Sequence, residues 1–239
     1  MSLSTGFQPL YKQVYDLLTS RLVDGSWKPS QLIPSEMALA DELGVSQGTV
    51  RKALNQMVTE KMLERRQGKG TFVAEHTQES SLFRFFRLRE PNGESLIPET
   101  NVISSSRREA TDEEACKLNL PLNAPIVELV RLRFIKQKPT VLEKVIQPLS
   151  IFPDIDKQAE IPNALYILYQ EKYGITIVSV DDELRAVELP EDMAKHLQLP
   201  AGSPVLMIER LSVNIDGRVV ELSTAYCSSE NFVYSARLT

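Results

Sequence analysis

The sequence predicts an α+β protein: a small helical domain at the N-terminus, then a larger domain of antiparallel strands with helices. Two short helical patterns lie on either side of Gly44, and a charged hairpin pattern follows them. Farther along, segments rich in Val, Ile and Leu alternate with turn residues, and one sequence pattern recurs 79 positions later. At 239 residues the chain is long enough for one or two domains with a substantial core.

Suitable end residues mark the N-terminal helices. A first helical pattern begins at Pro9. Ser35 can cap a second helix, and Gly44 can end it because glycine adopts a left-handed conformation without strain. Ser46 can cap a third helix. The apolar residues of this third helix share one face: Val50, Leu54, Met57 and Val58. Two helices joined by a short glycine-containing turn predict a helix-turn-helix.

The polar face of the third helix carries side chains suited to reading DNA bases. Gln47 and Arg51 are four residues apart and therefore neighbours, with Thr49 and Lys52 beside them. Gln and Arg have donors and acceptors that match base edges in the major groove. We therefore expect Gln47, Thr49 and Arg51 to read bases and Lys52 to bind phosphate. The alternative is an ordinary solvated helix face.

A hairpin pattern over residues 63–73 has Gly68, Lys69 and Gly70 at its tip. Glycines there would let the backbone approach a phosphate or a minor groove closely. Residues 45–73 contain six Lys or Arg against two Asp or Glu, a local charge of +4, whereas the whole chain has a net charge of −5. The net positive charge is therefore confined to this region, which favours DNA binding there.

This stretch resembles the winged helix-turn-helix of the GntR family of bacterial transcription regulators. The resemblance lies in these motifs: Pro9-Leu10-Tyr11, Pro34-Ser35-Glu36, Leu43-Gly44-Val45-Ser46, Thr49-Val50-Arg51 and Gly68-Lys69-Gly70-Thr71-Phe72-Val73. With the patterns above, it implies a DNA interface formed by Ser35, Ser46, Gln47, Thr49, Arg51, Lys52, Gly68, Lys69 and Gly70. Met37 and Gln47 stand where the family usually has arginines, so we expect an operator unlike the family's usual half-site.

A polar stretch without periodicity predicts a linker at residues 75–81, between a domain of residues 1–74 and one of residues 82–239. Because this linker has little apolar content, we expect it to act as a hinge. The two cysteines lack metal-ligand spacing, which suits a reducing cytosol. We find no signal peptide and no apolar run long enough to cross a membrane, so a cytoplasmic protein is expected.

The second half predicts alternating strands and helices. Strands are expected at 82–88, 126–135, 140–147, 176–189, 205–214 and 219–226. Helices are expected to start at Thr111 and to span residues 163–173 and 190–197.

An internal repeat divides this second half. One copy runs from Leu118 to Leu132 and the other from Leu197 to Leu211, each with a Leu-x-Leu-Pro motif before a strand hairpin. The second strand of each hairpin carries a glutamate, Glu143 or Glu221. A duplicated unit predicts a pseudo-twofold axis, and we hypothesise that the two glutamates face one cavity on it.

The second domain resembles the UTRA effector-binding domain of the HutC subfamily, which has a chorismate-lyase-like antiparallel sheet with helices. The resemblance lies in residues 130–133, 139–143, 165–166, 173–175, 199–206, 209–210, 220–221 and 226. It implies a small-molecule effector bound by Arg131, Arg133, Glu143, Tyr166, Glu221 and Tyr226. Ala164 stands where the subfamily commonly has serine, which argues against a sugar phosphate. The alternative for the arginines is surface ion pairing.

The chain offers little for catalysis. His76 and His196 have no neighbouring Cys or Asp in a known catalytic pattern, and no nucleotide-binding glycine motif occurs. We therefore expect no catalytic residue, metal or cofactor. The sequence predicts a homodimeric repressor that binds a palindromic DNA operator and leaves it when a small-molecule effector binds. The alternatives are a constitutive DNA-binding protein whose second domain only dimerises, and an enzyme fused to a DNA-binding module.

Overall fold

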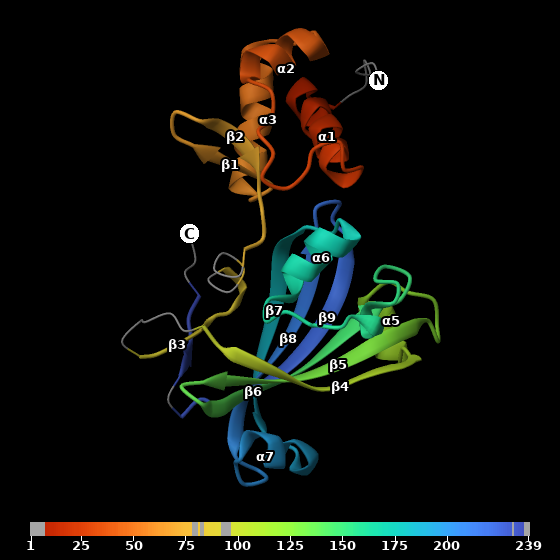
Figure 1. Cartoon of the computed structure of the whole chain (residues 1–239), viewed down its shortest axis with the longest axis vertical. Coiled ribbons are helices and arrows are strands. Elements are labelled where there is room, and N and C mark those ends of the chain that lie inside the picture. The colour runs from red at the N-terminus through yellow and green to blue at the C-terminus, as the bar shows by residue number, and fades with distance from the viewer. Residues whose placement is uncertain (1–7, 78–80, 82–83, 92–96, 231, 237–239) are drawn as a thin grey trace.

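The computed structural model describes residues 8–77, 81, 84–91, 97–230 and 232–236. It has a helical domain at one end and a sheet domain at the other (Figure 1). The α+β prediction is confirmed. The division into residues 1–74, 75–81 and 82–239 stays a prediction, and residues 78–80, 82 and 83 lie outside the described part.

Three helices and a hairpin build the helical domain. Its elements are α1 (Leu10–Val23), α2 (Glu36–Leu43), α3 (Gln47–Thr59), β1 (Leu63–Arg66) and β2 (Gly70–Val73). Ser35 and Ser46 cap α2 and α3, each accepting a backbone N–H hydrogen bond of 3.2 Å. Gly44 has the left-handed φ of 65° that the sequence predicts. The predicted starts of α2 and α3 and the predicted end of α2 are therefore confirmed.

The apolar side of α3 is buried in the core of the helical domain. Val50, Ala53 and Met57 are fully buried against α1 and α2, where Val14 and Leu18 are also fully buried. Since these contacts fix the rotation of α3 about its axis, its polar face is left towards solvent.

The sheet domain is organised around one antiparallel sheet of six strands in the order β4-β5-β6-β9-β8-β7. The strands are β4 (Glu99–Glu109), β5 (Pro125–Ile135), β6 (Lys138–Pro148), β7 (Ile177–Glu188), β8 (Pro204–Asn214) and β9 (Val219–Cys227). From the central β6–β9 pair, the strands run outwards as β6-β5-β4 on one side and β9-β8-β7 on the other. Each half of the sheet is thus formed by three consecutive strands in the same order, which agrees with the predicted duplication. The edge strand β4 is absent from the sequence prediction because its Ser- and Arg-rich residues are almost all exposed.

Shorter elements surround this sheet. They are β3 (Leu88–Arg89), α5 (Asp112–Lys117), the 3-10 helix η1 (Ile155–Lys157), α6 (Leu165–Tyr173), α7 (Glu191–Leu197) and β10 (Val233–Tyr234). The predicted strand at 82–88 is wrong in its described part: Arg84 and Phe85 are helical, and only Leu88 enters a strand, paired with Tyr234.

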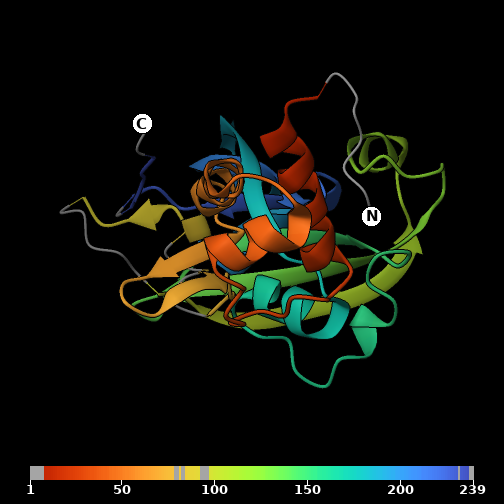
Figure 2. The same cartoon turned by 90° about the horizontal axis from the view of Figure 1, so that it is seen from above.

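The two domains meet at the end of the sheet that carries α6, whereas α7 lies at the opposite end (Figure 1). Seen along the long axis, the helical domain lies over the sheet domain (Figure 2). Val178 and Ile215 of the sheet domain pack against the core of the helical domain. The described linker residues are held by contacts: His76 is only 9% exposed, and its backbone N–H donates to Gln170 Oε1 at 2.8 Å.

Burial of His76 should make folding stability depend on pH. Burial and the nearby charge of Arg84 lower the pKa of His76 to about 4. Between that value and the unfolded pKa near 6.5, only the unfolded chain takes up the proton, so stability falls as the pH falls through this window. We expect His76→Gln to reduce the loss of unfolding free energy between pH 7 and pH 5 by about 2 kcal/mol, measured by urea denaturation. Equal losses in both proteins would contradict the buried neutral ring.

Candidate nucleic-acid interface and ligand pocket

The polar face of α3 presents the predicted DNA-reading residues to solvent. Gln47, Arg51 and Lys52 are exposed, and Thr49 is half-buried with its hydroxyl 2.8 Å from that of Ser46. The ammonium of Lys52 lies 3.8 Å from the centre of the Tyr11 ring. The structure thus brings the predicted α3 residues together on one exposed face.

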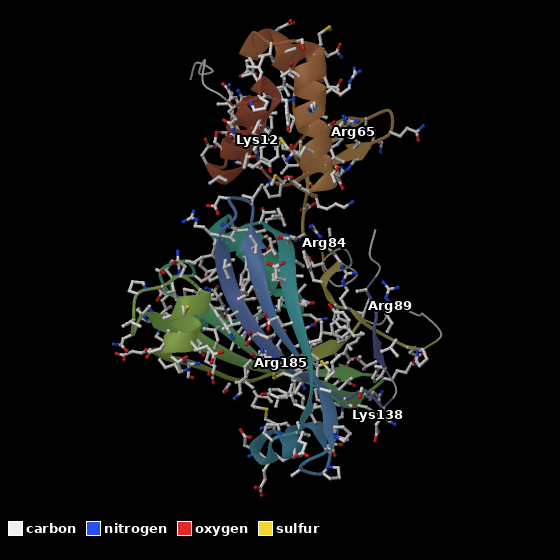
Figure 3. The ribbon with its side chains drawn as sticks, turned by 180° about the vertical axis from the view of Figure 1, so that it is seen from behind. Lys12, Arg65, Arg84, Arg89, Lys138 and Arg185 are labelled. Carbon is white, nitrogen blue, oxygen red and sulfur yellow. The ribbon has the colours of Figure 1, made fainter. Side chains whose placement is uncertain are left out.

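A carboxylate that sequence reasoning does not select connects the three parts of this interface. Glu36, at the start of α2, accepts hydrogen bonds from Arg51 Nε at 2.8 Å and Gln47 Nε2 at 3.4 Å. Its other oxygen accepts from Arg65 Nη2 of the hairpin at 3.1 Å. Figure 3 labels Arg65 on this hairpin. Glu36 therefore orders the side chains of α3 and the hairpin before any ligand is present. No spacing in the sequence signals this role.

The tip of the hairpin requires glycine at two positions. Gly68 has φ 70° and Gly70 has φ 117°, a region that side-chain-bearing residues rarely adopt. A Cβ at Gly70 would also lie 2.7 Å from Leu32 Cδ1. Lys69, between them, is exposed. The backbone conformation, more than the space available, explains both glycines.

Gly70→Ala should destabilise the hairpin. The strained φ costs about 1–3 kcal/mol, and the Leu32 side chain must also move. The measurement is the midpoint of thermal unfolding, with Gly48→Ala as the control. Gly48 lies in α3, has no strained φ and leaves its added Cβ 3.8 Å from the nearest atom. Equal stability of the two variants would contradict the strain at Gly70.

A cavity of about 80 Å³ lies in the sheet domain. Five predicted effector-binding residues line it: Arg131, Arg133, Glu143, Tyr166 and Glu221. Glu143 pairs across the sheet with Ala225, so it lies on the same face as Glu221 four residues earlier on β9. The prediction that the two glutamates face one cavity is therefore confirmed.

The structure does not place Tyr226 with these residues. Its neighbours Ala225 and Cys227 line the cavity, and successive strand residues point to opposite faces. Tyr226 instead packs against the cluster of Leu142 and α7 on the other side of the sheet. Its assignment to the pocket is corrected by this strand alternation.

A buried ion cluster forms the most polar wall of the cavity. Glu143 Oε2 accepts from Arg131 Nη2 at 2.5 Å and from Arg133 Nε at 3.2 Å. Burial alone would raise the pKa of Glu143, but the two guanidinium groups more than offset burial and lower it to about 2. Arg131 Nε and Arg133 Nη1 are buried without a hydrogen-bond partner among the described residues. Two unpaired donors of this kind can receive an anion.

Glu221 lies in a different environment, although it shares the cavity. Burial raises its pKa, and it forms no ion pair with any residue that the structure describes. Its carboxylate accepts from the hydroxyls of Tyr169 and of Ser212, the latter at 2.8 Å. The Tyr166 hydroxyl lies 2.8 Å from that of Ser212, so this network leads from the carboxylate to the cavity wall.

The cavity also contains residues that sequence reasoning missed. Arg210 lines it and donates to both oxygens of Asp182, at 2.6 and 2.7 Å. Tyr234 of β10 lines it too and donates to Asp182 at 2.6 Å. The repeat could have identified Arg210, since this residue lies 79 positions after Arg131.

The described residues include no cluster of three or more His, Cys, Asp or Glu side chains able to hold a metal ion. In the same part of the chain, no helix is both long and apolar enough to cross a membrane.

Residues 10–73 match the family described as bacterial regulatory proteins, gntR family, and residues 93–233 match the UTRA domain. The chain belongs to the GntR family of transcription regulators, with a UTRA domain. This GntR-family protein is 29% identical over 231 residues, 96% of both chains, to the mannosyl-D-glycerate transport/metabolism system repressor of Escherichia coli strain K12.

Two further comparisons agree. The protein is 30% identical over 224 residues to the probable fructoselysine utilization operon transcriptional repressor of Shigella flexneri, covering 92% of this chain and 90% of the relative. Its fold is similar to the crystal structure of PhnF from Mycobacterium smegmatis, with a TM-score of 0.58 and 21% identity over 95% of this chain and 99% of that chain. The GntR-family protein is a DNA-binding regulator that responds to a small-molecule effector.

Proposed function

We propose that the protein is a homodimeric repressor that leaves a palindromic operator when a small anionic, hydroxylated compound binds in its sheet domain. The observation that carries this proposal is the pair of buried guanidinium donors without partners, Arg131 Nε and Arg133 Nη1, beside Glu143 and Glu221 in one cavity. Cationic donors suit a carboxylate or phosphate, and carboxylate acceptors suit hydroxyl groups.

At the DNA end, the α3 face enters the major groove. Gln47, Thr49 and Arg51 read bases. Phosphates lie against Lys52 and against the two N-cap residues, Ser35 and Ser46. The hairpin tip, with Gly68, Lys69 and Gly70, lies along the neighbouring groove or backbone. Glu36 holds Arg51 through Nε and Gln47 through Nε2, which leaves the Nη groups of Arg51 and Oε1 of Gln47 for contacts with bases.

The names of two relatives support the proposed ligand class. Mannosyl-D-glycerate and fructoselysine both combine a carboxylate with sugar hydroxyls. The match to this chain covers at least 90% of the length of each relative. The cavity offers arginines for the first group and glutamates for the second. A carboxylated sugar derivative therefore fits better than an apolar effector.

Dimerisation belongs to the sheet domain in this proposal, since the helical domain is small and uses its exposed face for DNA. Two DNA-binding domains then read half-sites about one helical turn apart. The protein acts in the cytoplasm and carries out no catalysis. Its polar cavity residues are explained by ligand binding, and its relatives are transcription regulators.

The test has two stages. Selection from a pool of random duplexes with the full-length protein should yield a palindromic site. A thermal-shift screen of sugar acids, sugar phosphates and sugar–amino acid conjugates should then yield a stabilising compound, since ligand at one hundred times its Kd adds about 2.7 kcal/mol. We expect the compound to release the selected duplex and to lose its effect in Arg133→Met. No stabilisation would favour a regulator whose second domain only dimerises, and stabilisation without release would contradict release of the operator by the bound compound.

A further inference from the structure

The side chain of Gln170 bonds the backbone at the point where the helical domain joins the linker. Its Oε1 accepts from the His76 backbone N–H at 2.8 Å, and its Nε2 donates to the Ala74 carbonyl at 3.3 Å. A third bond, from Nε2 to Thr176 Oγ1 at 3.0 Å, fixes the amide group itself. Gln170 is 6% exposed, so these bonds are protected from competing water. A glutamine of α6 thus holds the chain where it leaves the helical domain.

The ring of His76 contacts the cavity wall directly. Its centroid lies 6.0 Å from that of Tyr166 and 6.1 Å from that of Phe85. These two rings pack edge to face at 4.8 Å, and both line the cavity. The Arg84 side chain, which lies at the junction of the two domains in Figure 3, covers Phe85 at 4.8 Å and donates to the Val178 carbonyl.

Both sets of contacts start from one face of α6. Tyr166 and Gln170 are four residues apart and are therefore neighbours on the helix. Ala164 and Leu165, at its N-terminal end, also line the cavity. A displacement of α6 would therefore act on the linker through both Gln170 and the Tyr166 ring, whereas a displacement of the ring alone would act through its contact with His76.

We infer that Tyr166, His76 and Gln170 form a coupling unit through which occupancy of the cavity changes how firmly the linker is held, and so how the DNA-binding domain is positioned. The inference rests on the proposed function of the cavity. A ligand can act in this way only if it binds the two linker states with different affinity. The contact between the Tyr166 ring, which lines the cavity, and the His76 ring of the linker supplies that difference.

Amide hydrogen exchange of the full-length protein at His76 tests the unit without DNA and without ligand. We expect Gln170→Ala and Tyr166→Ala each to accelerate exchange of this amide at least tenfold. Tyr166→Phe keeps the ring and should leave the rate within twofold. Met193→Ala in α7, at the far end of the sheet domain, controls for general loosening. If Tyr166→Ala does not fold, Tyr166→Leu takes its place.

An unchanged His76 rate in Tyr166→Ala would overturn the inference, as would equal acceleration by Met193→Ala. A second arm uses millimolar inorganic phosphate as the anion. If phosphate raises Tm, it should change the His76 rate at least threefold in the wild type but not in Gln170→Ala. A rise in Tm without that change would also overturn the inference. No rise in Tm would count against the anion pocket itself, and the variants would then decide the coupling unit alone.

Discussion

Glu143→Ala is expected to lower the free energy of unfolding by about 3–5 kcal/mol, the typical loss when one partner of a buried ion pair is removed. The carboxylate neutralises two guanidinium groups at once. Arg131 is 2% exposed and Arg133 is 8% exposed, so neither can turn to bulk water when Glu143 is lost. Urea denaturation at a fixed protein concentration gives the value.

Glu183→Ala is the matched control. Its ion pair with Arg185 has side chains 70% and 64% exposed, so its removal should cost no more than about 1 kcal/mol. The pH dependence provides a second check. Because the folded pKa of Glu143 is about 2, its contribution is complete above the unfolded pKa near 4.5 and is lost as the pH falls towards 2. The variant should therefore lose less stability than the wild type across that window. Similar losses for the Glu143 and Glu183 variants at neutral pH would refute the buried cluster.

Arg51→Ala is expected to weaken binding to the selected operator by about 1–3 kcal/mol and to relax the preference at one base pair. The guanidinium is more than half exposed on α3 and is already oriented by Glu36. Fluorescence anisotropy with the operator and with single-base variants measures both effects.

Lys69→Ala is the comparison for this prediction. A lysine at the hairpin tip has no base-specific geometry, so its loss should weaken all duplexes alike and reduce the salt slope by about one. Equal losses on operator and random DNA for Arg51→Ala would contradict base reading by Arg51.

Local signals in the sequence were enough to predict the helical domain. Ser35, Gly44 and Ser46 act within one turn of their own positions, so their roles can be read from neighbouring residues. The duplicated strands were also predictable because their apolar residues are buried in the sheet. By contrast, β4 lies at an exposed edge and carries mostly polar residues, which hide its periodicity.

The candidate sites were less predictable where distant residues meet. The Glu36 contacts with Arg51 and Arg65 span 15 and 29 positions, and no local pattern predicts such pairs. Tyr226 was misplaced because a shift of one residue on a strand changes the face on which a side chain lies. The linker was expected to act as a hinge, and its polar sequence gave no sign of the hydrogen bond from His76 to Gln170, which lies 94 positions away.

The duplicated sheet carries equivalent arginines with opposite connections. Arg131 is paired across the sheet with Glu143 on the inner strand β6, whereas Arg210 is paired with Asp182 on the outer strand β7. One guanidinium is drawn towards the pseudo-twofold axis and the other away from it. A compound turned end for end would therefore meet a different arrangement of charge. Under the proposed function, we expect the pocket to prefer a molecule whose two ends differ over one that is chemically symmetric.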